Sequence, residues 1–276
     1  MSTVPALLAL LAAALLAAGA LGAAVARLRS QRRLLGRRLE QSARELDRLQ
    51  RSFARFAPAE LVERIAAEDP QLSGGERREV TVLFADLRDF TQLSERLDPA
   101  QVLDMLNGYF LAMTAAIQSH HGHVTRLMGD GIMSVFGALE RNPWHVQDAV
   151  EAALAMRESL AGYNESLRQR GLPELAFGVG IHCGPVIAGL VGSQSMQEFT
   201  VLGDVVNVAS RVEALTRRLG GDILVTDDVR SVLGDRFLMT AMPPADIKGK
   251  SRPVLTWAVQ SLALAAMAAE HQASVH

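Results

Sequence analysis

The sequence predicts an α+β fold of the ferredoxin-like kind, a sandwich with a βαββαβ core. Short apolar segments typical of strands are interrupted by longer helical segments, and two strands are joined by a tight Gly-Asp-Gly turn at 129–131. The chain has 276 residues, a formal net charge of −2 and 49% hydrophobic residues, which fits one globular domain with additional segments. We expect that domain to cover residues 80–260.

The N-terminal segment 1–26 predicts a transmembrane anchor. Residues 4–26 carry no charge, and such a helix is long enough to cross a hydrocarbon core of roughly 30 Å. The rival interpretation is a cleaved signal peptide, because small residues such as Ala18 and Ala20 could precede a cleavage site. Arginines follow the apolar run and none precedes it. The positive-inside rule therefore favours an uncleaved single-pass helix in the inner or plasma membrane, with the rest of the chain in the cytoplasm.

Residues 27–66 predict a helical linker that forms a parallel dimeric coiled coil, and the alternative is a single amphipathic helix on the folded domain. Pro70, Gly74 and Gly75 indicate a loop at 67–79, and a tail at 261–276 follows the domain. The coiled-coil seam steps alternately by four and three residues with one polar position: Leu35, Leu39, Ser42, Leu46, Leu49, Phe53 and Phe56.

The first half of the domain begins with a strand at 80–85, where apolar or small residues occupy both faces of an extended chain. A helix is expected from Pro99 to about residue 122. The hairpin 123–137 follows, because the glycines on either side of Asp130 supply the backbone freedom of a tight turn.

The second half of the domain continues the alternation of helix and strand. The single cysteine, Cys183, excludes an intrachain disulfide. Periodicity predicts helices at 142–171 and 204–218, and strands at 176–184, 197–203, 222–226 and 253–259.

Two carboxylates predict a metal site. Asp86 ends the first strand, and Asp130 occupies the tip of the hairpin. In a ferredoxin-like sheet these two elements are neighbours, so both side chains converge at one end of the sheet. Ions such as Mg²⁺ often use only one or two protein carboxylates and leave positions for water and phosphate. The alternative is that one aspartate caps a helix and the other is an ordinary turn residue.

Four segments in order resemble the catalytic domain of class III nucleotide cyclases: VTVLFADLRDFT, RLMGDGIMSVFG, GVGIHCGPVIAGLVG and FTVLGDVVNVASRVE. The resemblance runs from about residue 79 to 259. The chain has no GxxxxGK[ST] loop, and its hairpin lacks the GG(D/E)EF turn of diguanylate cyclases. The resemblance implies an enzyme that converts a nucleoside triphosphate to a 3′,5′-cyclic monophosphate and pyrophosphate.

The resemblance also implies the residues of the site. Asp86, Asp130 and the backbone carbonyl of Leu87 would bind two Mg²⁺ or Mn²⁺ ions per active site. Asn207 would orient the ribose, and Arg211 would contact the α-phosphate. The sites of this family lie between the chains of a head-to-tail dimer. A homodimer is therefore expected, and the coiled coil fits that expectation.

Substrate contacts follow by the same resemblance. Lys248 and Lys250, in DIKGKSRP, match the triphosphate-binding segment. Arg126 and Thr200 occupy the positions that choose the purine, where adenylate-forming relatives typically have Lys and often Asp. Arginine only donates, so Arg126 suits the acceptor N1 of adenine and opposes the N1–H of guanine. Thr200 donates or accepts, so it does not decide.

The sequence therefore predicts a membrane-anchored, homodimeric adenylate cyclase that uses ATP. One alternative is a guanylate cyclase. Another is a catalytically silent nucleotide-binding signalling module of the same fold, against which the intact set Asp86, Asp130, Asn207 and Arg211 argues. The nearly balanced charge gives no indication of nucleic-acid binding.

Overall fold

The computed structural model describes residues 59–67, 69–193 and 196–263, together with helical positions between 27 and 44. The chain divides into two compact units, Met1–Glu63 and Arg64–His276, and the second contains the sheet and the candidate site. None of the helices in these described parts is long and apolar enough to span a membrane. The predicted anchor at 4–26 and most of the predicted coiled-coil seam lie outside the described residues.

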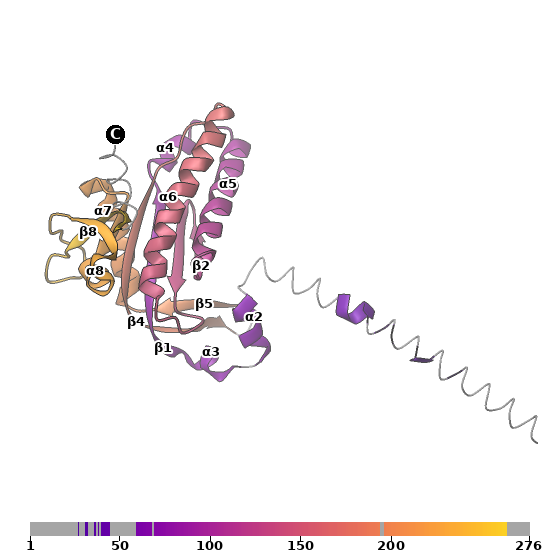
Figure 1. Cartoon of the computed structure of the whole chain (residues 1–276). Coiled ribbons are helices and arrows are strands. Elements are labelled where there is room, and N and C mark those ends of the chain that lie inside the picture. The colour runs from indigo at the N-terminus through magenta and orange to yellow at the C-terminus, as the bar shows by residue number, and fades with distance from the viewer. Residues whose placement is uncertain are drawn as a thin grey trace, which may run out of the picture. The chain divides into compact units, whose positions relative to one another are not determined.

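The predicted mixed α+β fold is confirmed, with helices and strands alternating along the chain (Figure 1). The helices are α2 (Ala59–Ala66), α3 (Pro70–Gly74), α4 (Phe90–Ser94), α5 (Pro99–Gln118), α6 (His145–Gln169), α7 (Asp204–Leu219), α8 (Asp227–Leu233) and the 3₁₀ turn η1 (Gly234–Arg236). The strands are β1 (Glu76–Leu87), β2 (Gly122–Met128), β3 (Gly131–Phe136), β4 (Phe177–Ser193), β5 (Met196–Leu202), β6 (Ile223–Thr226), β7 (Phe237–Ala241) and β8 (Thr256–Leu262).

The strands form one sheet in the order β2-β3-β1-β4-β6-β8-β7, and β5 pairs with β4 off this path. Strands β1 to β4 pair antiparallel and, with α5 and α6, give the βαββαβ unit that the sequence predicts. Strand β6 is parallel to β4 and antiparallel to β8. The order places β1 in the centre of the unit, beside the hairpin strand β3.

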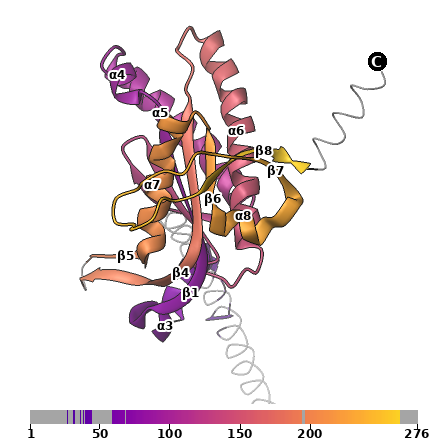
Figure 2. The same cartoon turned by 90° about the vertical axis from the view of Figure 1, so that its left-hand side faces the viewer.

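Helices cover both faces of the sheet. Helices α5 and α6 lie side by side on one face, and α7 lies on the other (Figures 1 and 2). Alternate residues of β4 explain the difference, because Phe177, Val179 and Ile181 belong to the main hydrophobic core with residues of α5 and α6. A Cβ at Gly180 would lie 2.0 Å from the backbone nitrogen of Glu213. Helix α7 therefore packs directly on the β4 backbone.

Two strands, β1 and β4, are longer than the sequence predicts. The expected loop at 67–79 contains α3, and β1 begins at Glu76 because residues 76–78 still pair with residues 186–188 of β4. The sequence predicts that the second of these strands ends at residue 184, but β4 has 17 residues and continues to Ser193. Its second half pairs with β5, from Ile187 opposite Leu202 to Ser193 opposite Met196. This β4–β5 hairpin is called the arm below.

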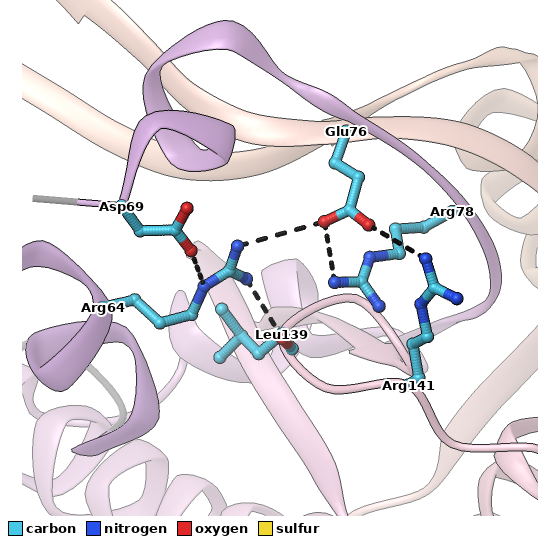
Figure 3. A network of polar contacts seen from close by, with 6 residues as sticks. All are labelled: Arg64, Asp69, Glu76, Arg78, Leu139 and Arg141. Atoms are coloured by element: carbon cyan, nitrogen blue, oxygen red, sulfur yellow. Dashed lines mark hydrogen bonds and ion pairs between the residues drawn. The ribbon is translucent and has the colours of Figure 1, made fainter. Parts of the chain in front are cut away.

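A polar network holds the start of the second unit (Figure 3). Arg64 donates to the carboxylate of Asp69 at 2.8 Å and to the carbonyl of Leu139 at 3.0 Å. Glu76, the first residue of β1, accepts a hydrogen bond from Arg78 at 2.7 Å. The network joins the residues that precede β1 to the loop that follows β3.

Candidate active site

The structure brings Asp86 and Asp130 together at one end of the sheet. Met128 pairs with Gly131, so Gly129 and Asp130 form a two-residue hairpin loop with a positive φ at Gly129. A Cβ at Gly131 would lie 3.2 Å from Oδ1 of Asp86, which shows that this carboxylate lies against the hairpin. The predicted convergence is therefore present, and the role of the pair in metal binding stays a prediction.

The surroundings of Asp86 disfavour its negative charge. Burial raises the pKa of Asp86 most, the Asp130 carboxylate raises it further, and Arg217 lowers it. A partly buried carboxylate that is also close to a second one is stabilised by a nearby cation.

In this structure that cation is the guanidinium of Arg217, near the end of α7. Its Nη2 donates to Oδ2 of Asp86 at 2.9 Å and to the carbonyl oxygen of Leu87 at 3.0 Å. Two predicted metal ligands thus contact one positive group through oxygen atoms, the atom type that hard cations prefer. The described residues contain no group of three or more His, Cys, Asp or Glu that could form a complete metal cage. Ions such as Mg²⁺ often use only one or two protein carboxylates and complete their coordination with water and substrate phosphates.

Glu213 is a second acidic neighbour that the sequence did not reveal. Burial raises the pKa of Glu213 to about 7, and Asp86 adds to the effect, while Arg217 and Arg88 oppose it. Its Oε1 has no hydrogen-bond partner among the described residues. The sequence signal for Glu213 and Arg217 is weak, because both lie on a helix whose orientation depends on its packing against β4.

The first half of α7 and the loop beside it gather four of the predicted site residues. The guanidinium of Arg211 donates to the backbone carbonyl of Lys248, and Lys250 Nζ lies 2.6 Å from the carboxylate of Asp204. Asn207 lies one helical turn before Arg211, and its exposed side chain makes no hydrogen bond within the described structure. The loop at 248–250 therefore lies against the first half of α7.

The predicted purine-choosing residues lie on β2 and β5. Arg126 of β2 forms a two-point ion pair with Glu198 of β5, with Nε 3.0 Å from Oε1 and Nη2 2.6 Å from Oε2. Thr200 follows Glu198 by two residues, so both side chains lie on the same face of β5. The sequence prediction did not include Glu198, whose contact with Arg126 joins residues 72 positions apart.

Within one chain these groups form two separate sets. Arg217 contacts Asp86 and Leu87, whereas Arg211, six residues earlier on α7, contacts the loop at 248–250. Six helical residues correspond to about 9 Å of rise. No hydrogen bond or ion pair in the described parts of the chain joins Asp86 or Asp130 to Asn207 or Arg211.

Comparison with known proteins agrees with the resemblance seen in the sequence. The family described as "Adenylate and Guanylate cyclase catalytic domain" matches residues 74–261. An adenylate cyclase of Anabaena cylindrica is 33% identical over 233 residues, covering 81% of this chain. The match covers 45% of that relative, so this chain spans less than half the length of the curated relative.

Solved structures of both kinds of cyclase are similar to this chain. The crystal structure of the guanylyl cyclase Cya2 has a TM-score of 0.65 at 35% identity, covering 68% of this chain and 94% of that one. The crystal structure of the adenylyl cyclase CyaB from P. aeruginosa has a TM-score of 0.64 at 28% identity, covering 68% of this chain and 96% of that one. These similarities support the fold, and they do not distinguish ATP from GTP as the substrate.

Proposed function

Because the chain belongs to the family of adenylate and guanylate cyclase catalytic domains, we propose that it is an adenylate cyclase that converts ATP to 3′,5′-cyclic AMP and pyrophosphate. The observation that carries the proposal is the convergence of the Asp86 carboxylate and the Leu87 carbonyl on one positive group, with Asp130 beside them. Carboxylate and carbonyl oxygens of this kind hold the divalent ions that assist phosphoryl transfer.

Asp86, Asp130 and the Leu87 carbonyl would hold two Mg²⁺ or Mn²⁺ ions. When bound, such ions neutralise charge on the attacking and leaving oxygens of an in-line displacement. The chain's own contribution here is to place two carboxylates at the end of one buried strand and the tip of one tight hairpin. The paired backbone of the strand and of the hairpin keeps the two carboxylates at a fixed distance from each other.

The remaining roles belong to side chains on α7 and the following loop. Arg211 would bind the α-phosphate, because a guanidinium is always charged and presents several donors in a fixed geometry. Asn207, exposed and free of hydrogen bonds in the described structure, is available to the ribose. Lys248 and Lys250 would bind the β- and γ-phosphates, and Lys250 would exchange its contact with Asp204 for the substrate.

We propose that the active site is completed by a second copy of the chain. The metal-binding set and the Arg211 set are held apart within one chain, since α7 directs Arg217 towards Asp86 and Arg211 towards residue 248. A head-to-tail homodimer would bring one set from each chain to each site. The predicted coiled coil at 27–66 would support that pairing.

The choice of ATP rests on Arg126 and on the similarity to adenylate cyclases. Arg126 donates and cannot accept, so it matches N1 of adenine. The second candidate is a guanylate cyclase. Two observations favour it: the similarity to the guanylyl cyclase Cya2 at 35% identity, and the acceptor that Glu198 places beside Arg126.

We further propose that residues 4–26 anchor the protein in the inner or plasma membrane with the catalytic domain in the cytoplasm. The uncharged run and the arginines that follow it support this topology. A chain without residues 1–26 should move from the membrane fraction to the soluble fraction of a cell lysate. An unchanged distribution would contradict the anchor.

The proposal is tested by measuring cyclic nucleotide production by the purified chain, with ATP and GTP in parallel and with Mg²⁺ and Mn²⁺. Asp86→Ala should abolish product, because it removes a ligand of the metal site. Asp104→Ala is the matched control, since Asp104 is an exposed aspartate of α5 that is paired with Arg170. Cyclic AMP that vanishes only in Asp86→Ala supports the proposal, and cyclic GMP alone supports the second candidate. No product from either nucleotide would favour the silent module.

A further inference from the structure

Glu213 of α7 is a partly buried carboxylate to which the proposed function gives no role. A Cβ at Gly178 would lie 2.9 Å from Oε1 of Glu213, and Gly178 is the residue of β4 that pairs with Asp86. Paired residues of neighbouring strands are about 5 Å apart. The carboxylate of Glu213 therefore lies over the strand position next to Asp86.

This carboxylate lacks the partner that its position calls for. Its Oε1 is buried and has no hydrogen-bond partner among the described residues. Burial raises the pKa of Glu213 most and Asp86 raises it further, whereas Arg217 and then Arg88 lower it. A carboxylate that has lost solvation without gaining a hydrogen bond is stabilised by any charged donor that reaches it.

Arg217 is the arginine that can move to Glu213. It follows Glu213 by four residues on α7, and side chains at this spacing are neighbours on a helix, with the acidic residue in the favourable N-terminal position. The Arg217 side chain is 50% exposed, so it can change its conformation without disturbing the core. Arg88 is held elsewhere, because its Nη2 donates to the carbonyl of Gly221 at 2.7 Å.

In this structure the guanidinium of Arg217 is at the predicted metal ligands instead. Its Nη2 lies 2.9 Å from Oδ2 of Asp86 and 3.0 Å from the carbonyl oxygen of Leu87. Among the described residues, Arg217 forms its ion pair with Asp86 and none with Glu213. Two positive groups at the same oxygens repel each other. Arg217 therefore has to move when a divalent ion binds there.

We propose that Glu213 is a positioning residue of the metal site, which accepts the guanidinium of Arg217 when a divalent ion binds Asp86 and Leu87. The inference rests on the proposed function, because it depends on the metal site proposed there. Arg217 has a carboxylate partner in both states, and the buried oxygen of Glu213 gains its partner in the ion-bound state. Glu213 thus strengthens ion binding through Arg217, without contacting the ion.

The test is a double-mutant cycle that is measured by Mn²⁺ binding, without turnover. The full chain is titrated with Mn²⁺, and electron paramagnetic resonance measures the free ion. Kd is determined for the unmodified chain, Glu213→Gln, Arg217→Gln and the double variant. Asp86→Ala defines the Mn²⁺ that binds elsewhere on the chain.

Glu213→Gln keeps the shape of the side chain and removes its charge. It should raise Kd most when Arg217 is present, because the displaced guanidinium then has no carboxylate partner. The increase in Kd should be about two- to fivefold larger in the presence of Arg217 than in the Arg217→Gln background, the range of an ion pair between partly exposed groups. The direct attraction between Glu213 and the ion is common to both backgrounds and cancels in this comparison.

Glu165→Gln is the matched control. Glu165 is an exposed glutamate of α6 that is ion-paired with Arg168, three residues later, at 2.9 Å. This change should leave Kd for Mn²⁺ unchanged in both backgrounds. Glu213→Asp is a second variant that keeps the charge on a shorter side chain. It should raise Kd only in the presence of Arg217, because it loses reach and not charge.

Three results would overturn the inference. Equal increases in Kd with and without Arg217 would mean that Glu213 acts on the ion only through its charge. An increase that disappears in an Arg88→Gln background, and not in the Arg217→Gln background, would make Arg88 the partner. An unchanged Kd in Glu213→Gln would mean that Glu213 has no part in ion binding.

Cyclic nucleotide production separates this inference from the proposed function. A chain that makes no cyclic nucleotide but shows the coupled effect on Mn²⁺ binding would contradict the proposed function and support the role of Glu213. A chain that makes cyclic AMP but shows equal increases in both backgrounds would do the reverse. A chain without Asp86-dependent Mn²⁺ binding would contradict both this inference and the proposed metal site.

Discussion

Arg217 stands where the proposed metal site needs positive charge. Its Nη2 contacts Asp86 and Leu87 at 2.9 and 3.0 Å, so a divalent ion and this guanidinium would compete for the same two oxygens. The contact is half exposed on the arginine side, with 50% of the side chain accessible. The competition is therefore moderate.

Arg217→Gln should bind Mn²⁺ more tightly, by about two- to fivefold, the range expected for an exposed ion pair. Titration of the protein with Mn²⁺, followed by electron paramagnetic resonance of the free ion, measures this without turnover. Arg218→Gln is the control, because Arg218 lies in the same last turn of α7 and removes the same charge. Equal effects of the two variants would contradict a direct competition at Asp86.

His145 predicts a pH dependence of stability. Its Nδ1 lies 2.8 Å from the hydroxyl of Thr81, and burial lowers the pKa of His145 although Glu79 and Asp148 oppose the shift. The unfolded chain therefore takes up the proton first, near pH 6.5. Stability from the neutral imidazole is complete above that pH and is lost as the pH falls below it.

In His145→Asn, the free energy of unfolding should decrease less steeply as the pH falls below 6.5. The slope should change by at most about 1.4 kcal/mol per pH unit for one proton. Urea unfolding at pH 5.5, 6.5 and 7.5 measures it. His182, whose pKa burial also lowers, remains in the variant and keeps part of the dependence. Identical slopes for the variant and the unmodified chain would show that His145 does not titrate differently in the two states.

Some residues of the candidate site could be predicted from the sequence, and others could not. Asp86 and Asp130 were predictable because each is fixed by local structure, a strand end and a hairpin tip, within a fold with known neighbours. Glu198 and Arg217 contact partners 72 and 131 residues away. Such contacts depend on how the arm and α7 are placed in three dimensions, and no local pattern specifies that placement.

At the scale of elements, the close contact of α7 with β4 positions half of the site. The contact requires glycine at 180, where a Cβ would lie 2.0 Å from the backbone nitrogen of Glu213. Backbone cannot move as a flexible side chain can, so a methyl group there would push α7 away.

Gly180→Ala should lower the free energy of unfolding by about 3 kcal/mol or more, the upper range for overpacking. Gly162→Ala is the matched control in α6, where a Cβ would meet nothing within 4 Å. That change should stabilise the protein by roughly 0.5–1 kcal/mol, because alanine favours a helix. Urea unfolding compares the two, and a mild effect at Gly180 would mean that α7 shifts without cost.

Element boundaries were the weaker part of the sequence prediction. The sequence predicts a strand at 176–184, and Gly184 and Pro185 follow the pattern of a strand end. Strand β4 nevertheless continues to Ser193, since Pro185 still lies opposite Glu79 of β1 and the following residues pair with β5. Pairing with neighbours on both sides outweighed the local turn signal.

At the scale of the whole molecule, the separation of the two residue sets predicts complementation between inactive chains. Asp86→Ala removes one set and Arg211→Ala removes the other. In a head-to-tail dimer, a mixed pair of these variants has one intact site and one doubly damaged site. Each variant alone should be inactive, and an equal mixture allowed to exchange chains should recover roughly a quarter of the unmodified activity.

The measurement is cyclic nucleotide production by the co-expressed variants at matched total protein. Co-expression of Asp86→Ala with Asp130→Ala is the control, because both changes damage the same set and no mixed dimer has a repaired site. Recovery in neither mixture would place all essential groups of a site within one chain.

The exposure of Arg126 and Glu198 bears on how selectivity can evolve. Substitutions at exposed positions usually change stability by about 0.5 kcal/mol or less. Arg126, which is predicted to choose the purine, and its partner Glu198 lie outside the main core, on an edge strand and an arm, whereas the predicted metal ligands lie on the central strand and its hairpin. Substitutions at Arg126 and Glu198 should therefore cost little folding stability, so this edge of the site can change while the strand and hairpin that carry Asp86 and Asp130 stay the same.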